Sequence, residues 1–150
     1  MHSYTDWNAN LLVVLGTVVS VGICVLLHYE GLSLLSRWQQ QHHDHNRRRK
    51  VLYGIFGVLF LHVLEIWIFG LTSWLLLGAG NTGGVAGTHQ PGILDAVYLA
   101  AMTYSTVGFG DLTPVGPIRF IFGTMALTGF VLITWSASFT YLEMERYWRR

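Results

Sequence analysis

The sequence contains few charged residues. Asp, Glu, Lys and Arg make up 11% of its 150 residues, whereas 52% are hydrophobic. Because a typical soluble domain is about one quarter charged, this composition excludes a soluble globular protein and indicates a membrane protein. A helix needs roughly 20 apolar residues to cross the hydrocarbon core of a bilayer. Three stretches meet that length, at residues 11–35, 51–77 and 117–142, and they leave almost nothing for a soluble domain.

Several features that define other classes of protein are also missing. Cys24 is the only cysteine, so no disulfide can form within the chain and we expect this residue simply to pack. No Lys or Arg precedes the first apolar stretch, which favours a retained helix over a cleavable signal peptide. No stretch carries Arg at every third position, so we expect no voltage-sensor helix. About eight residues follow the last stretch, and we therefore expect no cytoplasmic ligand-binding domain.

The basic residues gather in two places. The formal net charge is only +1, but Arg37 and residues 47–50 crowd the segment between the first two apolar stretches, and the chain ends in "ERYWRR". Loops rich in Lys and Arg stay in the cytoplasm, so both segments are predicted to lie inside and the N-terminus outside. The basic run is also predicted to meet anionic lipid. Beside it, His42, His43 and His45 are weak candidates for transition-metal ligands, with a solvated basic turn as the alternative.

A Gly-rich segment separates the second and third apolar stretches. Residues 78–92 spell "GAGNTGGVAGTHQPG", and so many glycines are not expected to sustain a helix or strand, which predicts an external loop. Residues 93–105 follow; they are apolar, with Pro91 just ahead and Asp95 in the first turn, both signals of a helix start. About 13 residues are too few to cross a bilayer. The order of segments therefore predicts a re-entrant helix, after which "TVGFGD" returns the backbone to the outer surface.

The alternating glycines of this returning backbone have a physical use. An extended strand points successive carbonyls in opposite directions, but Gly108 and Gly110 can adopt backbone angles closed to other residues, so every carbonyl can turn to one side. A ring of such carbonyls can replace the water around a cation, and the Thr106 hydroxyl can extend the row. We expect the Val107 and Phe109 side chains to point backwards onto the short helix. One strand cannot encircle an ion, so four copies are needed.

These residues resemble the selectivity filter of the tetrameric potassium-channel superfamily. The stretch "TVGFG" at residues 106–110 is similar to that family's usual Thr-Val-Gly-Tyr-Gly pattern, and Asp111 after it also matches. The resemblance covers about residues 51–142 and is closest to small bacterial channels of the two-transmembrane type. It implies a C4 homotetramer that binds K⁺ ions through the carbonyls of Thr106, Val107, Gly108 and Phe109. It also places the Thr106 hydroxyl at the inner mouth.

Two supports usual in that family are absent. Phe109 replaces the commoner Tyr, and Met102 stands where some members have Glu. Glu65 is a candidate replacement, because counting about 1.5 Å per residue from Val51 places it roughly 21 Å into a core of about 30 Å. An intramembrane carboxyl is a functional candidate by default. We expect Glu65 to hydrogen-bond the short helix or residues 103–105 from behind, with His62, on the same helical face, as its partner.

Three other residues in the apolar stretches attract attention. The same count along the first stretch places His28 and Glu30 near the inner interface, where long or polar side chains reach water, so both are expected to be structural. Gly129, about halfway along the last stretch, is the candidate gating hinge that the family resemblance implies; close helix packing through a small residue is the alternative.

The sequence therefore predicts an all-α membrane protein with three transmembrane helices, a re-entrant pore helix and a filter loop, assembled as a C4 homotetramer. The predicted function is passive, potassium-selective conduction, with K⁺ bound in the filter by residues including Gly110 and the filter supported by Ser105, Asp111, Glu65 and His62. The alternatives are a weakly selective cation channel, a non-conducting membrane sensor or assembly subunit using the His-rich loop, and an intramembrane metalloenzyme built on His28, His62 and Glu65.

The remaining expectations concern partners and boundaries. No enzymatic activity, no cofactor beyond K⁺ and no nucleic-acid partner are expected, and the resemblance implies a prokaryotic plasma membrane. The predicted divisions are an external N-terminus and extra helix (1–36), a basic His-rich cytoplasmic loop (37–50), a pore domain (51–142) and a short cytoplasmic tail (143–150). Within the pore domain they are an outer helix (51–77), an external loop (78–92), a pore helix (93–105), a filter (106–110) and an inner helix (117–142).

Overall fold

The structure, a computed structural model, describes residues 6–41 and 47–148. Three of its helices are long and apolar enough to cross a membrane, and a fourth apolar helix is too short to do so. The protein is therefore an all-α membrane protein with three spanning helices, as the sequence predicted. In chain order the elements of the described residues are α1 (Trp7–Gln41), α2 (Arg47–Gly78), β1 (Gly84–Ala86), α3 (Ile93–Tyr104), β2 (Thr113–Val115) and α4 (Arg119–Trp148).

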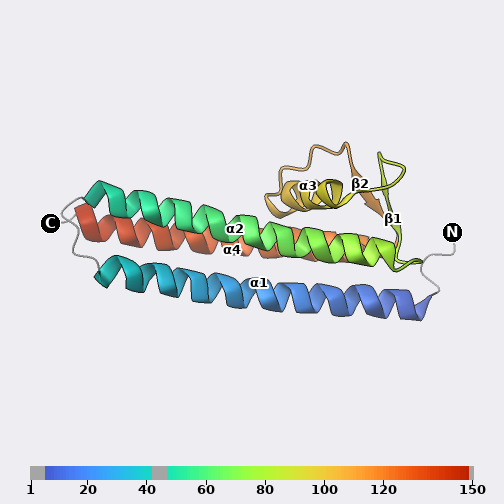
Figure 1. The fold of residues 1–150 in the computed structure, drawn as a ribbon, viewed down its shortest axis with the longest axis horizontal. Helices are drawn as coiled ribbons and strands as arrows, with labels where there is room; N and C mark the ends of the chain where they lie inside the picture. The colour runs from blue at the N-terminus through green and yellow to red at the C-terminus, as the bar shows by residue number, and fades with distance from the viewer. Residues whose placement is uncertain (1–5, 42–46, 149–150) are drawn as a thin grey trace.

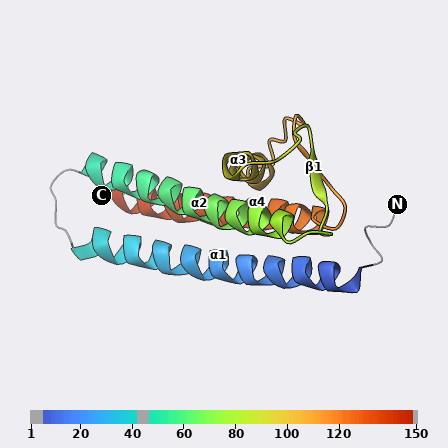
Figure 2. The same ribbon diagram turned by 45° about the vertical axis from the view of Figure 1, so that its right-hand side comes forward.

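The long helices α1, α2 and α4 lie side by side, and α3 packs at one end of them (Figures 1 and 2). Both α2 and α4 contact α1 and also contact α3, and α3 lies on the side of this pair away from α1 (Figure 1). The start of α1 lies at the same end of the molecule as α3 and the strands, whereas the start of α2 and the end of α4 lie at the other (Figure 1). The start of α2 and the end of α4 thus lie at the same end of the helix bundle (Figure 1).

Short polar side chains fix where two of the helices begin. The Asp6 carboxylate accepts hydrogen bonds from the backbone amides of Asn8 and Ala9, at 3.1 and 3.3 Å, which satisfies two of the amides that lack a partner at a helix start. In the same way the Asp95 carboxylate accepts a 2.8 Å bond from the backbone amide of Gly92, the residue before α3. Asp95 therefore marks the start of the short helix, as its position in the sequence indicated.

The spanning helices are longer than the apolar stretches that predicted them. α1 continues to Gln41, beyond the stretch that ends at residue 35, and α4 continues to Trp148. Near the end of α1, Gln39 is buried and its side-chain amide donates to the Lys50 carbonyl at 3.3 Å, while the Lys50 ammonium donates to the Gln39 carbonyl at 3.1 Å. Polar residues thus extend α1 beyond the end that hydropathy alone predicts.

The Gly-rich segment was expected to hold no regular element, and this was wrong. β1 pairs antiparallel with β2, so that Val85 lies opposite Pro114. Gly83 and Gly87 flank β1 with positive φ, and a Cβ on either one would lie 2.2 Å from a backbone oxygen of the opposing segment. Glycine is therefore what lets the two segments approach. The small sheet ties the loop before α3 to the chain that follows the TVGFG segment, which we define as residues 106–110.

Candidate ion pathway and its supporting contacts

The TVGFG segment begins directly after α3 and has an alternating backbone. Thr106, Gly108 and Gly110 have φ values of 60°, 56° and 80°, whereas Val107 and Phe109 are not among the positive-φ residues. Alternating the sign of φ with a period of two rotates every second peptide plane, which brings successive carbonyls to the same side of the strand. The positive φ at Gly108 and Gly110 is the backbone freedom that the glycine alternation predicted, and Thr106 shares it although a residue with a Cβ rarely does so.

The C-terminal end of α3 holds the start of this segment. The backbone amides of Thr106 and Gly108 donate to the carbonyls of Thr103 and Met102, at 3.0 and 3.1 Å. Some members of the family that the motif resembles have Glu where this chain has Met102. The Met102 carbonyl still anchors the segment, because it accepts the Gly108 amide. The C-terminus of a helix carries a partial negative charge of about half an elementary charge, so a cation beside Thr106 is favoured electrostatically.

The side chains of Val107 and Phe109 do not pack on α3 within the chain. They are 56% and 71% exposed, so the expected backward packing is not present in a single copy. The cause is geometric, because α3 is one narrow helix and its buried face, which includes Ala96, Leu99 and Ala100, is already covered. Any cover for Phe109 must come from outside the chain described.

A contact that the sequence did not predict supports the far end of the segment. The Tyr98 hydroxyl, on α3, donates a 2.9 Å hydrogen bond to the carboxylate of Asp111, which follows Gly110. This bond and the Thr106 and Gly108 bonds connect α3 to both ends of the TVGFG segment. The sequence contains only a weak indication of this contact, namely a tyrosine near the middle of the short helix. It does not show that Tyr98 bonds Asp111 whereas Tyr104 bonds Glu65. Asp111, which the sequence predicted to support the filter, thus has Tyr98 as its hydrogen-bond partner.

Glu65 lies where the sequence count placed it and makes the expected contacts. Its side chain is fully buried, one carboxylate oxygen accepts a hydrogen bond from the Tyr104 hydroxyl, and the same oxygen lies 3.0 Å from Nδ1 of His62. Tyr104 is the last residue of α3. α2 therefore reaches the base of the TVGFG segment through one buried carboxylate. Ser105 takes no part, because its hydroxyl donates to the Ala101 carbonyl at 2.7 Å.

His28 was expected near the inner interface, and this was wrong. It is fully buried, its Nδ1 lies 2.8 Å from the second carboxylate oxygen of Glu65, and its Nε2 lies 3.3 Å from the Ser136 hydroxyl on α4. The error arose because α1 continues six residues beyond the apolar stretch, to Gln41, so His28 lies roughly 20 Å from the helix end rather than about half that. Glu30, by contrast, is exposed as expected.

Gly129 lies at a close approach between α4 and α3. A Cβ at this position would lie 2.1 Å from the Tyr104 carbonyl oxygen, so no larger residue fits without moving one of the helices. The packing explanation for this glycine is therefore supported. The contact also means that any bend of α4 at Gly129 would move against the residue that leads into the TVGFG segment.

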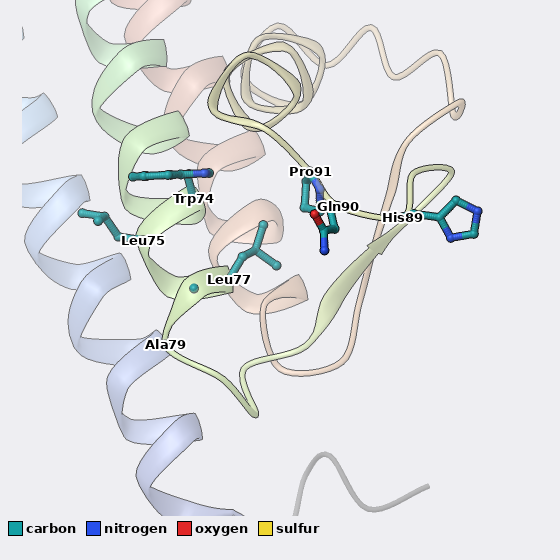
Figure 3. Close-up of a pocket in the computed structure, with 8 residues that line it drawn as sticks. Trp74, Leu75, Leu77, Ala79, His89, Gln90 and Pro91 are labelled. Atoms are coloured by element: carbon teal, nitrogen blue, oxygen red, sulfur yellow. The ribbon is translucent and has the colours of Figure 1, made fainter.

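One pocket lies at the C-terminal end of α2, with a volume of about 520 Å³. Trp74 and Leu77 of α2 form one wall and the chain that leads into α3 forms the other, while the His89 ring points away from them (Figure 3). Its lining includes no residue of the TVGFG segment. The other predicted metal candidates, His42, His43 and His45, lie outside the described residues.

Comparison with known proteins identifies the family. A family model described as "Ion channel" matches residues 51–143, which covers α2, the loop, α3, the TVGFG segment and most of α4. The chain belongs to this ion channel family. Family membership and the relatives below confirm the resemblance to the potassium-channel superfamily, and they point to an integral membrane transport protein rather than an enzyme.

Two curated relatives are similar to the chain. Protein LctB of Geobacillus stearothermophilus is 27% identical over 134 residues, which cover 89% of this chain and 91% of that protein. Two pore potassium channel c of Oryza sativa subsp. japonica is 33% identical over 72 residues, covering 47% of this chain and 15% of that protein. No solved structure matches the chain. Because the match to LctB leaves only about 16 of the 150 residues uncovered (150 − 134), it includes part of the 35-residue helix α1.

Proposed function

We propose that four copies of this chain form a potassium-selective channel in which residues 106–110 are the selectivity filter. The observation that carries the proposal is the alternating sign of φ at Thr106, Gly108 and Gly110, in a segment that starts at the negative end of α3. Four such segments around one axis would surround a cation with carbonyl oxygens in place of its hydration shell. Identical subunits that repeat one interface around a fourfold axis form a closed ring of four.

The distribution of basic residues supports an orientation for this channel. Arg49 is exposed near the start of α2, and the start of α2 lies at the same end of the molecule as the end of α4 (Figure 1). The positive-inside rule assigns that end to the cytoplasm, so the N-terminus, α3 and the outer mouth face the outside of a prokaryotic plasma membrane. The basic segment at residues 47–50 would then lie beside anionic headgroups of the inner leaflet.

The decisive experiment is to record currents from the purified protein in bilayers under opposed K⁺ and Na⁺ gradients. A reversal potential near the K⁺ value is the expected result. Gly108→Ala should abolish K⁺ current, because its φ of 56° disfavours any residue with a Cβ. Gly22→Ala is the matched control, since a Cβ at Gly22 meets nothing within 4 Å. A wild-type reversal potential near zero would instead establish a weakly selective cation channel, which the Phe109 and Met102 departures favour.

The absence of current would favour the second alternative, a non-conducting sensor or assembly subunit. A non-conducting sensor or assembly subunit would keep the fold and assemble, yet pass no ions at any pH, tension or metal concentration. The same preparation tests this, because assembly is measured separately from conduction.

Within the proposed channel, Glu65 supports the filter through Tyr104. The carboxylate accepts the Tyr104 hydroxyl's hydrogen bond in a fully buried site, where a lost partner is costly. Glu65→Gln should make the current decay about tenfold faster or reduce the selectivity for K⁺. The reason is that both oxygens of a carboxylate accept hydrogen bonds, whereas an amide has only one accepting oxygen. Recordings indistinguishable from wild type would remove this role, and Glu30→Gln, at an exposed position, is the control.

A further inference from the structure

The buried cluster of His28, His62 and Glu65 has a chemistry that ion conduction does not require. Each residue offers one metal-ligating atom, and the three atoms all lie within 4.8 Å of one another. His28 and Glu65 are fully buried, and His62 is 13% exposed. The residues come from two helices, so the cluster exists only because α1 packs on α2. Two imidazoles around one buried carboxylate form a set of groups that filter support does not require.

We propose that this cluster binds a divalent transition-metal ion, with Zn²⁺ as the best match, through His28, His62 and Glu65. Two His and one Glu form a ligand set that zinc uses in proteins, with bonds of about 2.0–2.2 Å and a fourth position for another ligand. Tetrahedral ligands at that bond length lie roughly 3.3 Å from one another. The Glu65 oxygens lie 2.8 and 3.0 Å from the two Nδ1 atoms, so small side-chain rotations suffice to admit the ion.

A candidate fourth ligand and a partner for one of the histidines lie beside the cluster. The Tyr104 hydroxyl lies 2.9 Å from Nδ1 of His62, so it occupies the free side of the proposed site. The Nε2 atom of His28 lies 3.3 Å from the Ser136 hydroxyl. Ligating histidines usually bond a second group through the ring nitrogen that does not bind the metal, which fixes the ring's orientation. Ser136 can do this for His28.

Electrostatics favour a cation at this point. A carboxylate in the middle of a membrane protein is costly unless positive charge or several hydrogen bonds compensate it. The groups that face Glu65 are His28, His62, Tyr104 and the thiol of Cys24, whose sulfur lies 3.9 Å from the Glu65 carbonyl. His28, His62 and Tyr104 lie within hydrogen-bonding distance of the carboxylate and compensate it in the absence of a metal. None of them carries a permanent positive charge, so a dication would add charge compensation to these bonds.

A groove gives the ion a route to the site. It lies between α2 and α4, has a volume of about 410 Å³, and has both His62 and Ser136 on its wall. The lining continues to Thr140, Tyr141 and Met144, toward the end of α4 that lies beside the start of α2 (Figure 1). His62, the most exposed of the three ligands, is thus the one that an arriving ion meets first.

Binding would change the contact that α3 makes with α2. The Glu65 oxygen that accepts from Tyr104 becomes a metal ligand, so Tyr104 either loses its acceptor or turns its oxygen toward the ion. In both cases the last residue of α3 shifts its bonding directly before Thr106. A change of K⁺ current on adding Zn²⁺ follows from this and rests on the proposed channel function, whereas metal binding itself does not.

The test measures binding of Co²⁺, which takes the place of Zn²⁺ and absorbs visible light strongly when tetrahedrally bound. The protein for this test is the full chain with His2, His42, His43, His45 and His89 changed to Gln, which leaves two of its seven histidines. One equivalent of Co²⁺ per chain should produce an intense visible band that Zn²⁺ removes. No band at millimolar Co²⁺ would overturn the proposal, whether or not the protein conducts K⁺.

Variants assign the band to the cluster. In the same background His28→Gln and Glu65→Gln should each weaken Co²⁺ binding by at least about 100-fold, as loss of one of three protein ligands implies, while Glu30→Gln leaves it unchanged. A band that survives His28→Gln in folded protein would overturn the assignment.

A second measurement needs no ligand variant, in case these fail to fold. The Trp135 ring lies 5.3 Å from the His28 ring, centroid to centroid, so bound Co²⁺ should quench Trp135 fluorescence. The quenching should disappear in Trp135→Phe, and quenching that is equal in the two proteins would place the ion elsewhere.

Discussion

Single residues on α2, α3 and α4 decide how the short helix α3 is held. Gly129 allows α4 to touch the Tyr104 carbonyl, Glu65 accepts from the Tyr104 hydroxyl, and Tyr98 donates to Asp111. At Gly129 the contact requires the absence of a side chain, whereas Glu65 and Tyr98 each contribute one hydrogen-bonding atom. Substitutions at these positions should therefore have larger effects than their chemistry alone suggests.

Gly129→Ala should destabilise the protein by about 3 kcal/mol, the upper end of the usual cost of overpacking. The reason is that the new methyl group would lie 2.1 Å from a backbone oxygen, which cannot rotate away as a side chain can. Thermal unfolding in detergent measures the effect. Gly22→Ala is the control, and it should be neutral or slightly stabilising because alanine favours helix. Equal stability of the two variants would show that α4 and α3 are not in the contact described.

Tyr98→Phe removes the hydrogen bond to Asp111 and leaves the ring in place. Within the proposed channel we expect K⁺ current to decay roughly threefold faster, a modest effect because the bond is exposed to solvent and competes with water. Macroscopic recordings at constant voltage measure the decay. The control is Tyr53→Phe, at the other end of the molecule, where the ring contacts Trp38 at a centroid distance of 5.4 Å. If both variants decay like wild type, Asp111 is held by another partner.

Among the elements, α1 is the helix that the bare pore module lacks. It is joined to the rest by contacts at three levels: Asp6 at its start accepts from the Asn81 side chain at 3.1 Å, His28 meets Glu65 near the middle, and Gln39 meets Lys50 near its end. Most of its remaining surface is apolar and exposed, as expected of a helix facing lipid. α1 therefore packs outside the pore module but is connected to it through polar contacts.

The start of α1 should respond to acid. The backbone amide of Ala9 and the Asn81 side chain hold the pKa of the Asp6 carboxyl below its usual 3.8. A carboxyl with a lowered pKa stabilises the folded state above about pH 3.8, and that contribution is lost as the pH falls through the lowered pKa. An NMR titration of the carboxyl should give a midpoint below 3.8.

A variant identifies the cause of that shift. Asn81→Ala should raise the Asp6 pKa only part of the way back, because the Ala9 amide is the larger cause. Thr88→Ala, in the same outer segment, is the control. An unshifted carboxyl in the wild-type protein would contradict the helix start described.

At the scale of the whole molecule, one chain leaves apolar surface uncovered at the point where the pore is proposed. Phe109 is 71% exposed and Val107 is 56% exposed, beside a segment whose carbonyls have no ion to bind unless other copies face them. A lipid environment does not explain these side chains, since they flank polar backbone. A neighbouring subunit does, because it would bury both residues and complete the ring of carbonyls.

Native mass spectrometry in mild detergent should therefore detect an assembly of four chains. Each chain has a mass of 16.9 kDa, which gives about 68 kDa for the tetramer. Phe109→Asp should reduce the fraction of tetramer, since it places a charge in the proposed subunit contact. Phe60→Asp, at another exposed apolar position on α2, is a control for the charge itself. A dimer or monomer as the dominant wild-type species would contradict the proposed pore.

The sequence by itself determined the membrane class, the three spans, the short helix, the alternating segment after it and the contact between Glu65 and α3. These features follow from composition, from lengths along one helix and from glycine's backbone freedom, all of which are local properties. The tertiary structure alone decided that His28 joins Glu65, that Tyr98 reaches Asp111, that the Gly-rich segment forms a strand and that Phe109 stays exposed in one copy. Each of these depends on how far a helix continues past its apolar stretch and on which face it turns to a neighbour, and those are settled by packing between segments distant in the chain.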